Sequence, residues 1–260
     1  MNRVNALFKR LRKAKRCGVI AYVTCGDGDT VRYVEELEAA GADAIELGVP
    51  FSDPIADGPV IQAASMRALA NGTSIRDVLA MARAIRERSM IPLIAFSYLN
   101  PIMRYGMERF ATEAATAGID GVLITDLPPE SADGTFKRAG LAPVFLLAPT
   151  STDARIRAVD RASDGFVYYV STTGVTGTRN ELDPALVDRL VEVRAKLRNP
   201  IAVGFGISRR EHYELLRDKC DAIVVGSAIV RAIGEGRSPG DVLTKLLLPR
   251  VGGGEGAAGG

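Results

Sequence analysis

A strand-like apolar run ends on a carboxylate at Glu46, and two more carboxylates, Asp53 and Asp57, follow in a loop with three prolines. A carboxyl group at the end of a buried strand is partly removed from water. Its pKa then rises towards the range useful for proton transfer. Glu46 is therefore a candidate acid or base, unless it is solvated or paired with a nearby base. Asp57 lies in a stiffened loop able to fold over the strand end, whereas Asp53 can brace that loop through its backbone.

Three glycine-rich segments later in the chain predict an anion site. They are TTGVTGT (172–178), GFGIS (204–208) and VVGSAIV (224–230), and the last two place glycine where a strand turns into a helix, with Ser208 or Ser227 near the helix start. Glycine lets backbone N–H groups approach a phosphate, and a helix N-terminus adds a favourable potential. Any one of these glycines could simply make a tight turn, but three such loops together favour phosphate binding.

The other residue types that could do chemistry give weaker signals. His212 is the only histidine and is expected on the surface of a helix, and no residues have metal-ligand spacing or form a Ser/His/Asp arrangement. Cys17, Cys25 and Cys220 are an odd number, which predicts free thiols in a reducing compartment, the cytoplasm. The net charge of +2 gives no reason to expect nucleic acid, and no apolar run approaches the ~18 residues of a membrane span.

Eight short apolar runs alternate with amphipathic segments, and this alternation predicts the elements that position these side chains. The runs are rich in Val, Ile and Leu without polar alternation, as in parallel strands buried on both faces. Eight strands, each followed by a helix, in about 250 residues predict a single-domain (β/α)8 TIM barrel; a doubly wound sheet is the alternative. The expected strands are 18–24, 42–48, 91–97, 120–125, 143–148, 165–170, 200–206 and 221–226.

An extra helix is expected before the first strand, with Val4, Leu7, Phe8, Leu11 and Ala14 on its buried face. The barrel would span residues 1–250, and the Gly-rich tail 251–260 is expected to be disordered. Barrels bind their ligands at the C-terminal ends of the strands, so Glu46, its loop and the glycine-rich segments should meet at one end. Helical spacing predicts further helices at 30–40, 75–88, 107–117, 129–139, 153–162, 184–197 and 209–217.

Longer motifs along nearly the whole chain resemble the tryptophan synthase alpha subunit family. The most specific is ELGVPFSDPIADGPVIQ (46–62); the others are AYVTCGD (21–27), YLNPIMRYG (98–106), DLPPE (126–130), STTGVTGTR (171–179), VGFGIS (203–208) and VVGSAIV (224–230). The resemblance implies a carbon–carbon lyase of tryptophan biosynthesis that splits indole-3-glycerol phosphate into indole and glyceraldehyde 3-phosphate by a retro-aldol step. It implies no cofactor in this subunit, and a beta subunit carrying pyridoxal phosphate that receives the indole in an alpha2-beta2 complex.

The same resemblance implies roles for individual residues. Glu46 would protonate C3 of the indole ring, Asp57 would hold the indole N–H, and Tyr168 would help to position the catalytic Glu or the substrate. The loops 50–60 and 171–181, with Asp53 and Pro54, would respond to the beta subunit. The phosphate would be bound by Gly177, Gly206, Gly226 and Ser227. The apolar indole pocket would be lined by Tyr22, Phe96, Leu123, Phe205 and Val224.

Three positions depart from the common family pattern. Gly28 stands where proline is usual, Thr172 where many relatives carry arginine, and Tyr22 where phenylalanine is frequent. These changes leave Glu46 and Asp57 in place but bear on loop closure and coupling to the partner. A barrel that mainly activates a beta subunit is therefore one alternative. A sugar-phosphate isomerase or aldolase is another, disfavoured because no Schiff-base lysine stands at a strand end.

Overall fold

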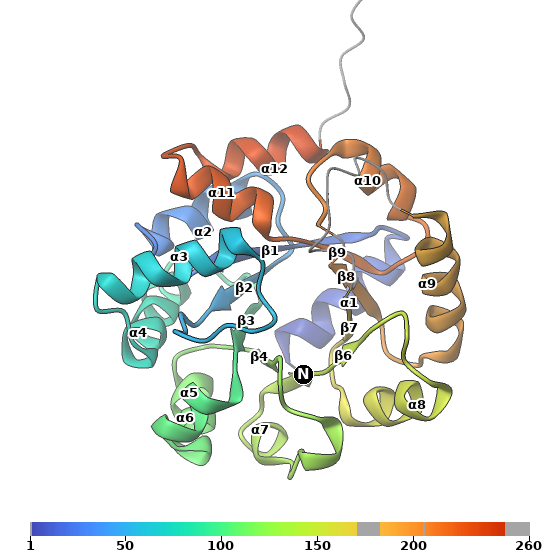
Figure 1. Cartoon of the computed structure of the whole chain (residues 1–260), viewed down its shortest axis with the longest axis horizontal. Helices are drawn as coiled ribbons and strands as arrows, with labels where there is room; N and C mark the ends of the chain where they lie inside the picture. Colours follow the sequence, from blue (N-terminus) through green and yellow to red (C-terminus); the bar gives the residue numbers. More distant parts are fainter. Residues whose placement is uncertain (1, 171–182, 205, 248–260) are drawn as a thin grey trace, which may run out of the picture.

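The computed structural model describes residues 2–170, 183–204 and 206–247. In this part of the chain nine parallel strands form one sheet that curls into a ring, and most of the helices surround it (Figure 1). Each apolar run of the sequence becomes a strand, and the TIM barrel prediction is confirmed. The strands are β1 (Gly18–Thr24), β2 (Ala44–Gly48), β3 (Leu93–Ser97), β4 (Gly121–Ile124), β5 (Ala142–Val144), β6 (Leu146–Leu147), β7 (Val167–Val170), β8 (Ile201–Gly204) and β9 (Ala222–Val225).

One predicted strand, 143–148, is two strands in the structure, β5 and β6, and these form the two ends of the sheet. Phe145, between them, donates its N–H to the Ser163 hydroxyl at 3.3 Å instead of to a neighbouring strand. Its carbonyl oxygen still accepts the Tyr168 N–H at 3.0 Å. The ladder is therefore interrupted at one residue, and the barrel closes there.

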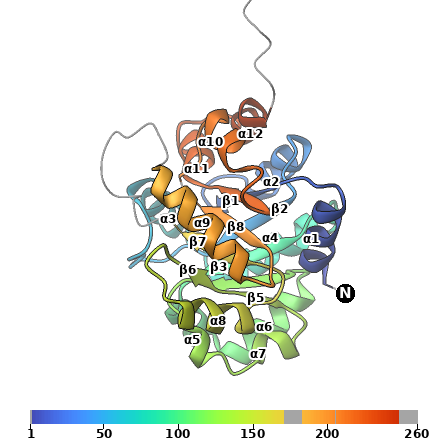
Figure 2. The same cartoon turned by 90° about the vertical axis from the view of Figure 1, so that its right-hand side faces the viewer.

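Helices cover the outer face of the strands, as Figure 2 shows from the side with α8 and α9 in front. The described helices are α1 (Arg3–Lys13), α2 (Thr30–Ala39), α3 (Pro59–Ala70), α4 (Ile75–Arg86), α5 (Leu99–Tyr105), α6 (Met107–Thr116), the 3-10 helix η1 (Pro129–Ser131), α7 (Thr135–Arg138), α8 (Asp153–Ala162), α9 (Pro184–Lys196), α10 (Arg210–Leu216), α11 (Ser227–Gly234) and α12 (Pro239–Leu247).

The predicted helix 129–139 is wrong as a single element, because η1 and α7 replace it. Gly134 separates them with a φ of 82°, a left-handed conformation that no helix continues through. The Asp133 carboxylate then accepts the Thr135 N–H at 2.8 Å and starts the second piece. Helices α3, α5, α11 and α12 were not among the predicted segments, although a helix start near Ser227 was expected.

Helix α1 closes the N-terminal end of the barrel, opposite the predicted site. Its buried side chains Val4, Leu7, Phe8 and Leu11 pack among the inward-facing residues of the strands. Burying a side chain of this size contributes roughly 1.5–3 kcal/mol. The helix ends at Lys13, so Ala14 is an exposed C-cap, and its expected place on the buried face is wrong.

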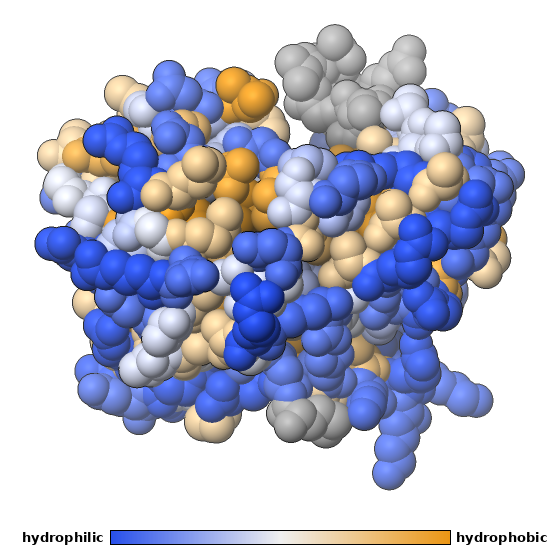
Figure 3. Space-filling model, turned by 90° about the horizontal axis from the view of Figure 1, so that it is seen from below, coloured by the Kyte–Doolittle hydropathy of each residue, from blue (hydrophilic) through white to orange (hydrophobic). Residues whose placement is uncertain are grey.

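The outer surface is mainly polar. Hydrophilic side chains dominate the face that Figure 3 shows, with apolar residues in patches between them. Within the described ranges, every helix is too short or too polar to cross a bilayer. The tail 251–260, for which disorder is predicted, lies outside the described residues.

Candidate active site

Glu46 lies at the centre of strand β2, two residues before the strand end where it was expected, and every residue of β2 is buried. Its exposed fraction is 0%, and neither carboxylate oxygen has a hydrogen-bond partner among the described residues. Parallel pairing places it beside Tyr22 of β1 and Ile94 of β3. Burial removes water from the charged form and raises the pKa of Glu46 to about 8. Near neutral pH the side chain therefore carries a proton that it can donate.

A cavity of about 130 Å³ lies against Glu46 at the C-terminal ends of the strands. The Phe96 ring packs in T-shaped pairs with two tyrosine rings, with centroid distances of 5.3 Å to Tyr22 and 6.4 Å to Tyr168. Apolar walls beside one buried carboxyl group suit a neutral aromatic ring that must exchange a proton. The cavity is lined by Tyr22, Glu46, Ile61, Phe96, Tyr168, Gly204, Gly206, Val224, Gly226 and Ser227.

Two glycines, which have no side chain, make room for the tyrosine rings at the cavity. A Cβ atom on Gly48 would lie 2.1 Å from the Tyr22 hydroxyl oxygen, and one on Gly204 would lie 2.6 Å from that of Tyr168. Burial, followed by the charge of Asp57, raises the pKa of Tyr22 well above its ordinary value. Burial, followed by the charge of Glu46, does the same for Tyr168. Both rings therefore stay neutral hydroxyl groups at the cavity wall.

The last two strands supply the polar end of the cavity. Gly226 is the N-cap of helix α11, which begins at Ser227, and Gly206 follows strand β8. The first N–H groups of a helix have no partner within the helix and favour an anion. These residues were predicted from the glycine pattern, and the structure brings them to the same cavity as Glu46.

Asp57 lies in the loop between β2 and α3, half-buried. Burial raises its pKa to about 6, and a hydrogen bond with the Tyr98 side chain opposes this rise. Although Asp57 does not line the cavity described above, its charge acts on both Tyr22 and Tyr168. Asp53 of the same loop is exposed and accepts a 2.5 Å hydrogen bond from the Ser52 hydroxyl, a side chain, rather than from the loop backbone as predicted.

The remaining predicted residues lie elsewhere. Leu123 is fully buried on β4 next to Phe96 and packs in the barrel interior without lining the cavity. Gly177 and Phe205 lie outside the described residues. His212 is on α10, away from the cavity. Among the described residues, no group of three or more His, Cys, Asp or Glu side chains could hold a metal ion.

Ile61 was not predicted at the site, and Tyr98 was noted only as part of the motif 98–106, without a role of its own. Ile61 belongs to α3, a helix that was not predicted, and it lines the cavity. Tyr98 follows β3 and is buried, with its ring 5.2 Å from that of Phe51. Its hydroxyl oxygen accepts the Ala56 N–H at 2.9 Å and bonds the Asp57 carboxylate. Tyr98 therefore fixes the loop that carries Asp57.

We expect Tyr98→Phe to move the acidic limb of the pH–rate profile to higher pH, because a hydrogen bond that lowers the pKa of Asp57 is removed. The kcat/KM should fall about 10-fold, since losing a hydrogen bond to a charged group costs about 1.5 kcal/mol. Steady-state rates across the pH range measure both effects. Tyr105→Phe is the control, because that hydroxyl bonds Glu113 on α6 instead. An acidic limb that stays in place would contradict this role.

Comparison with known proteins agrees with this geometry. The family profile described as tryptophan synthase alpha chain matches residues 8–249. The tryptophan synthase alpha chain of Solibacter usitatus is 52% identical over 239 residues, 90% of each chain, and that of Pelobacter propionicus is 48% identical over 237 residues, 89% of each.

Solved structures give the same result. Tryptophan synthase subunit alpha from Legionella pneumophila superposes with a TM-score of 0.87 at 35% identity, covering 95% of this chain and 97% of that one. A chain from work on the tryptophan synthase a2b2 complex of Pyrococcus furiosus has a TM-score of 0.83 at 41% identity, covering 88% and 97%. The chain belongs to the tryptophan synthase alpha chain family, the lyase subunit that splits indole-3-glycerol phosphate without a cofactor of its own and works with a beta subunit.

Proposed function

We propose that the cavity at Glu46 holds the indole ring of indole-3-glycerol phosphate and that Glu46 and Asp57 share the retro-aldol chemistry. One observation carries this proposal: a fully buried carboxyl group, with no partner for either oxygen among the described residues, faces an aromatic cavity. A buried acid without a structural partner destabilises the fold when it ionises. Proton transfer to the substrate would explain why a carboxyl group is present at this buried position.

In the proposed reaction Glu46 donates its proton to C3 of the indole ring. The ring then carries positive charge, and the bond between C3 and the glycerol carbon breaks with its electrons returning to the ring. The neighbouring glycerol hydroxyl loses its proton as its carbon becomes the aldehyde of glyceraldehyde 3-phosphate. The carboxylate that Glu46 has become accepts that proton, so the residue returns to its starting state.

Asp57 is proposed to act on the other side of the ring. Its carboxylate accepts a hydrogen bond from the indole N–H and stabilises the positive charge that protonation creates there. Its pKa of about 6 keeps it ionised while Glu46, with a pKa of about 8, stays protonated. Two carboxyl groups with separated pKa values can thus serve as acid and anion at the same pH.

The remaining predicted residues would bind the substrate. Tyr168 is proposed to position the ring and Glu46: both side chains line the cavity, and the charge of Glu46 contributes to the raised pKa of Tyr168. The phosphate is assigned to backbone N–H groups at the ends of the last strands. The proposed phosphate set is Gly177, Gly206, Gly226 and Ser227, and the proposed ring pocket is Tyr22, Phe96, Leu123, Phe205 and Val224.

The loop after β2 is proposed as part of the contact with the beta subunit. Ile55 at its tip is 86% exposed, beside Asp53 and Pro54. A large apolar side chain that is exposed to water next to the site suits a surface that a partner covers.

The proposed compartment is the cytoplasm, because all three cysteines are free thiols.

The test is an assay of indole and glyceraldehyde 3-phosphate released from indole-3-glycerol phosphate, with and without a beta subunit. We expect both products in equal amounts from the chain alone, and faster release with the partner. Absence of indole under both conditions would contradict the lyase proposal. If beta-subunit activity still rose in that case, the barrel would be an activator only.

A further inference from the structure

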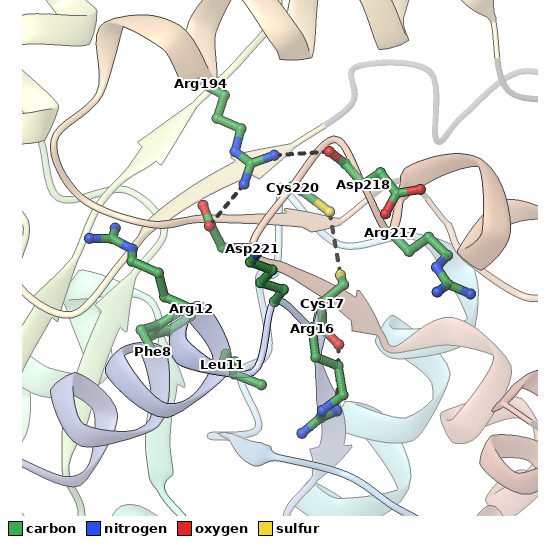
Figure 4. A pocket seen from close by; sticks show the side chains of 11 residues that line it. Phe8, Leu11, Arg12, Arg16, Cys17, Arg194, Arg217, Asp218, Cys220 and Asp221 are labelled. Carbon is green, nitrogen blue, oxygen red and sulfur yellow. Dashed lines mark hydrogen bonds and ion pairs between the residues drawn. The ribbon is translucent and has the colours of Figure 1, made fainter.

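Two thiols meet at the opposite end of the barrel from the active site. Cys17 precedes β1 and Cys220 precedes β9, and their Sγ atoms are 3.7 Å apart. Figure 4 shows the two side chains pointing toward one another. The backbone around them is fixed, because the Gly18 N–H donates to the Asp221 oxygen at 2.9 Å and Gly18 pairs with Ala222 in the sheet. The two sulfurs are thus held in contact by the parallel ladder itself.

Both thiols also border a cavity of about 270 Å³, which gives small molecules a route to them. Their residues are otherwise buried, with exposed fractions of 5% and 2%. Five basic and two acidic side chains line the same cavity. The lining residues are Phe8, Leu11, Arg12, Lys15, Arg16, Cys17, Arg194, Arg217, Asp218, Cys220 and Asp221 (Figure 4).

We propose that Cys17 and Cys220 are a site of reversible oxidation, where a small two-electron oxidant such as hydrogen peroxide forms an intramolecular disulfide. A disulfide needs its sulfurs about 2.05 Å apart, so they must approach from 3.7 Å. Side-chain rotation supplies this movement while the paired backbones stay in place. The product would join the first strand of the barrel covalently to the last.

The chemistry balances with peroxide as the oxidant. The hydrogen bond with Cys17, then burial, raises the pKa of Cys220 well above its ordinary value. The first step is therefore assigned to Cys17, which is also the more exposed residue of the pair. The Cys17 sulfur breaks the O–O bond, giving a sulfenic acid and one water molecule. The Cys220 sulfur then attacks the Cys17 sulfur and releases a second water molecule. Two thiols have lost two hydrogen atoms, and peroxide has become two waters.

Cys25 provides an internal control. It is fully buried, lines none of the cavities described here, and burial raises its pKa to about 12. The structure therefore assigns the oxidation to one pair and leaves the third thiol reduced. The pair also lies away from the residues around Glu46, so the disulfide should leave indole release unchanged.

The experiment treats the full-length protein with hydrogen peroxide and counts free thiols after denaturation. We expect the count to fall from three to one, non-reducing peptide mapping to join Cys17 to Cys220, and a thiol reductant to restore all three. Because the bridge closes a loop of about 200 residues, the melting temperature should rise by about 10 °C on oxidation. Cys17→Ser should abolish both changes, and Cys25→Ser should abolish neither.

Several outcomes would overturn the proposal: disulfides between molecules, sulfinic acid at either position, or oxidation of Cys25 at the same rate. Should Cys17→Ser fail to fold, a trivalent arsenical gives a second measurement on the wild-type protein. Such a reagent bridges two adjacent thiols without oxidising them. It should bind with one-to-one stoichiometry and protect Cys17 and Cys220, but not Cys25, from alkylation. Lack of this protection would equally exclude the site.

Discussion

Glu46→Gln is expected to abolish indole release while the protein stays folded and still binds glyceraldehyde 3-phosphate. Glutamine fills the same space but has no proton to give to C3 of the ring. Loss of a general acid typically lowers the rate by about 10²–10⁴-fold. Because the phosphate is assigned to backbone groups at the last strands, product binding should change little. Turnover is followed by indole release and binding by calorimetry; a near-wild-type rate would refute the mechanism.

The same variant tests the protonation state of Glu46 through the pH dependence of the free energy of unfolding. Its pKa is raised from 4.5 to about 8 in the folded protein. Between these pH values the unfolded chain releases a proton that the folded protein keeps, so this group's contribution to stability falls as the pH rises. At pH 7 the loss reaches about 3 kcal/mol. The difference in unfolding free energy between Glu46→Gln and wild type should therefore move in favour of the variant by about 3 kcal/mol between pH 4.5 and 7.

Glu46→Asp tests whether the position of the carboxyl group matters, because the variant keeps an acid at this strand position. The shorter side chain keeps a carboxyl group in the same buried strand, so the pH dependence of stability should persist. Its proton, however, lies about one methylene away from C3, and misplacement of this size can lower a rate about 10²-fold. A variant with wild-type rates would show that the position of the acid matters little, against the geometry proposed here.

The strand positions could be predicted because both faces of a barrel strand are buried. Apolar runs such as 42–48 and 165–170 need no alternation, and their predicted ends lie within two residues of β2 and β7. Two of the missed helices, α3 and α5, lack a clear apolar stripe. Helix α3 buries only the small side chains Ala64, Ser65 and Ala68, and α5 contains Pro101 and buries only Ile102.

Glu46 was visible in sequence because a carboxylate in an apolar run contradicts the local pattern. Tyr98 gave no such signal, since its role depends on a hydrogen bond to Ala56, 42 positions away. The close fit of Tyr168 against Gly204 likewise exists only once the strands are paired. Contacts between distant segments depend on how the strands and helices pack, and sequence periodicity does not predict them. The substrate was inferred from the family resemblance, because neither the periodicity nor the packing identifies it.

Asp57→Asn is expected to lower kcat by about 10²–10³-fold, the range for removing one group that stabilises developing charge. Asparagine can still accept a hydrogen bond from the indole N–H but carries no negative charge to offset the protonated ring. Burial raises the pKa of Asp57 to about 6, so wild-type activity should fall below pH 6 as this carboxylate takes up a proton. That limb should be absent from the variant, whereas the fall above pH 8, assigned to Glu46, should remain.

Asp53→Asn is the matched control, measured without a beta subunit because Asp53 is a proposed contact residue. It is the same substitution in the same loop, but its side chain is exposed and bonds only the neighbouring Ser52 among the described residues. We expect its rate and its pH profile to match the wild type. Equal losses in both variants would mean that the loop needs its negative charge for folding over the site. A loss confined to Asp57→Asn, together with the missing acidic limb, would place the charge at the indole nitrogen.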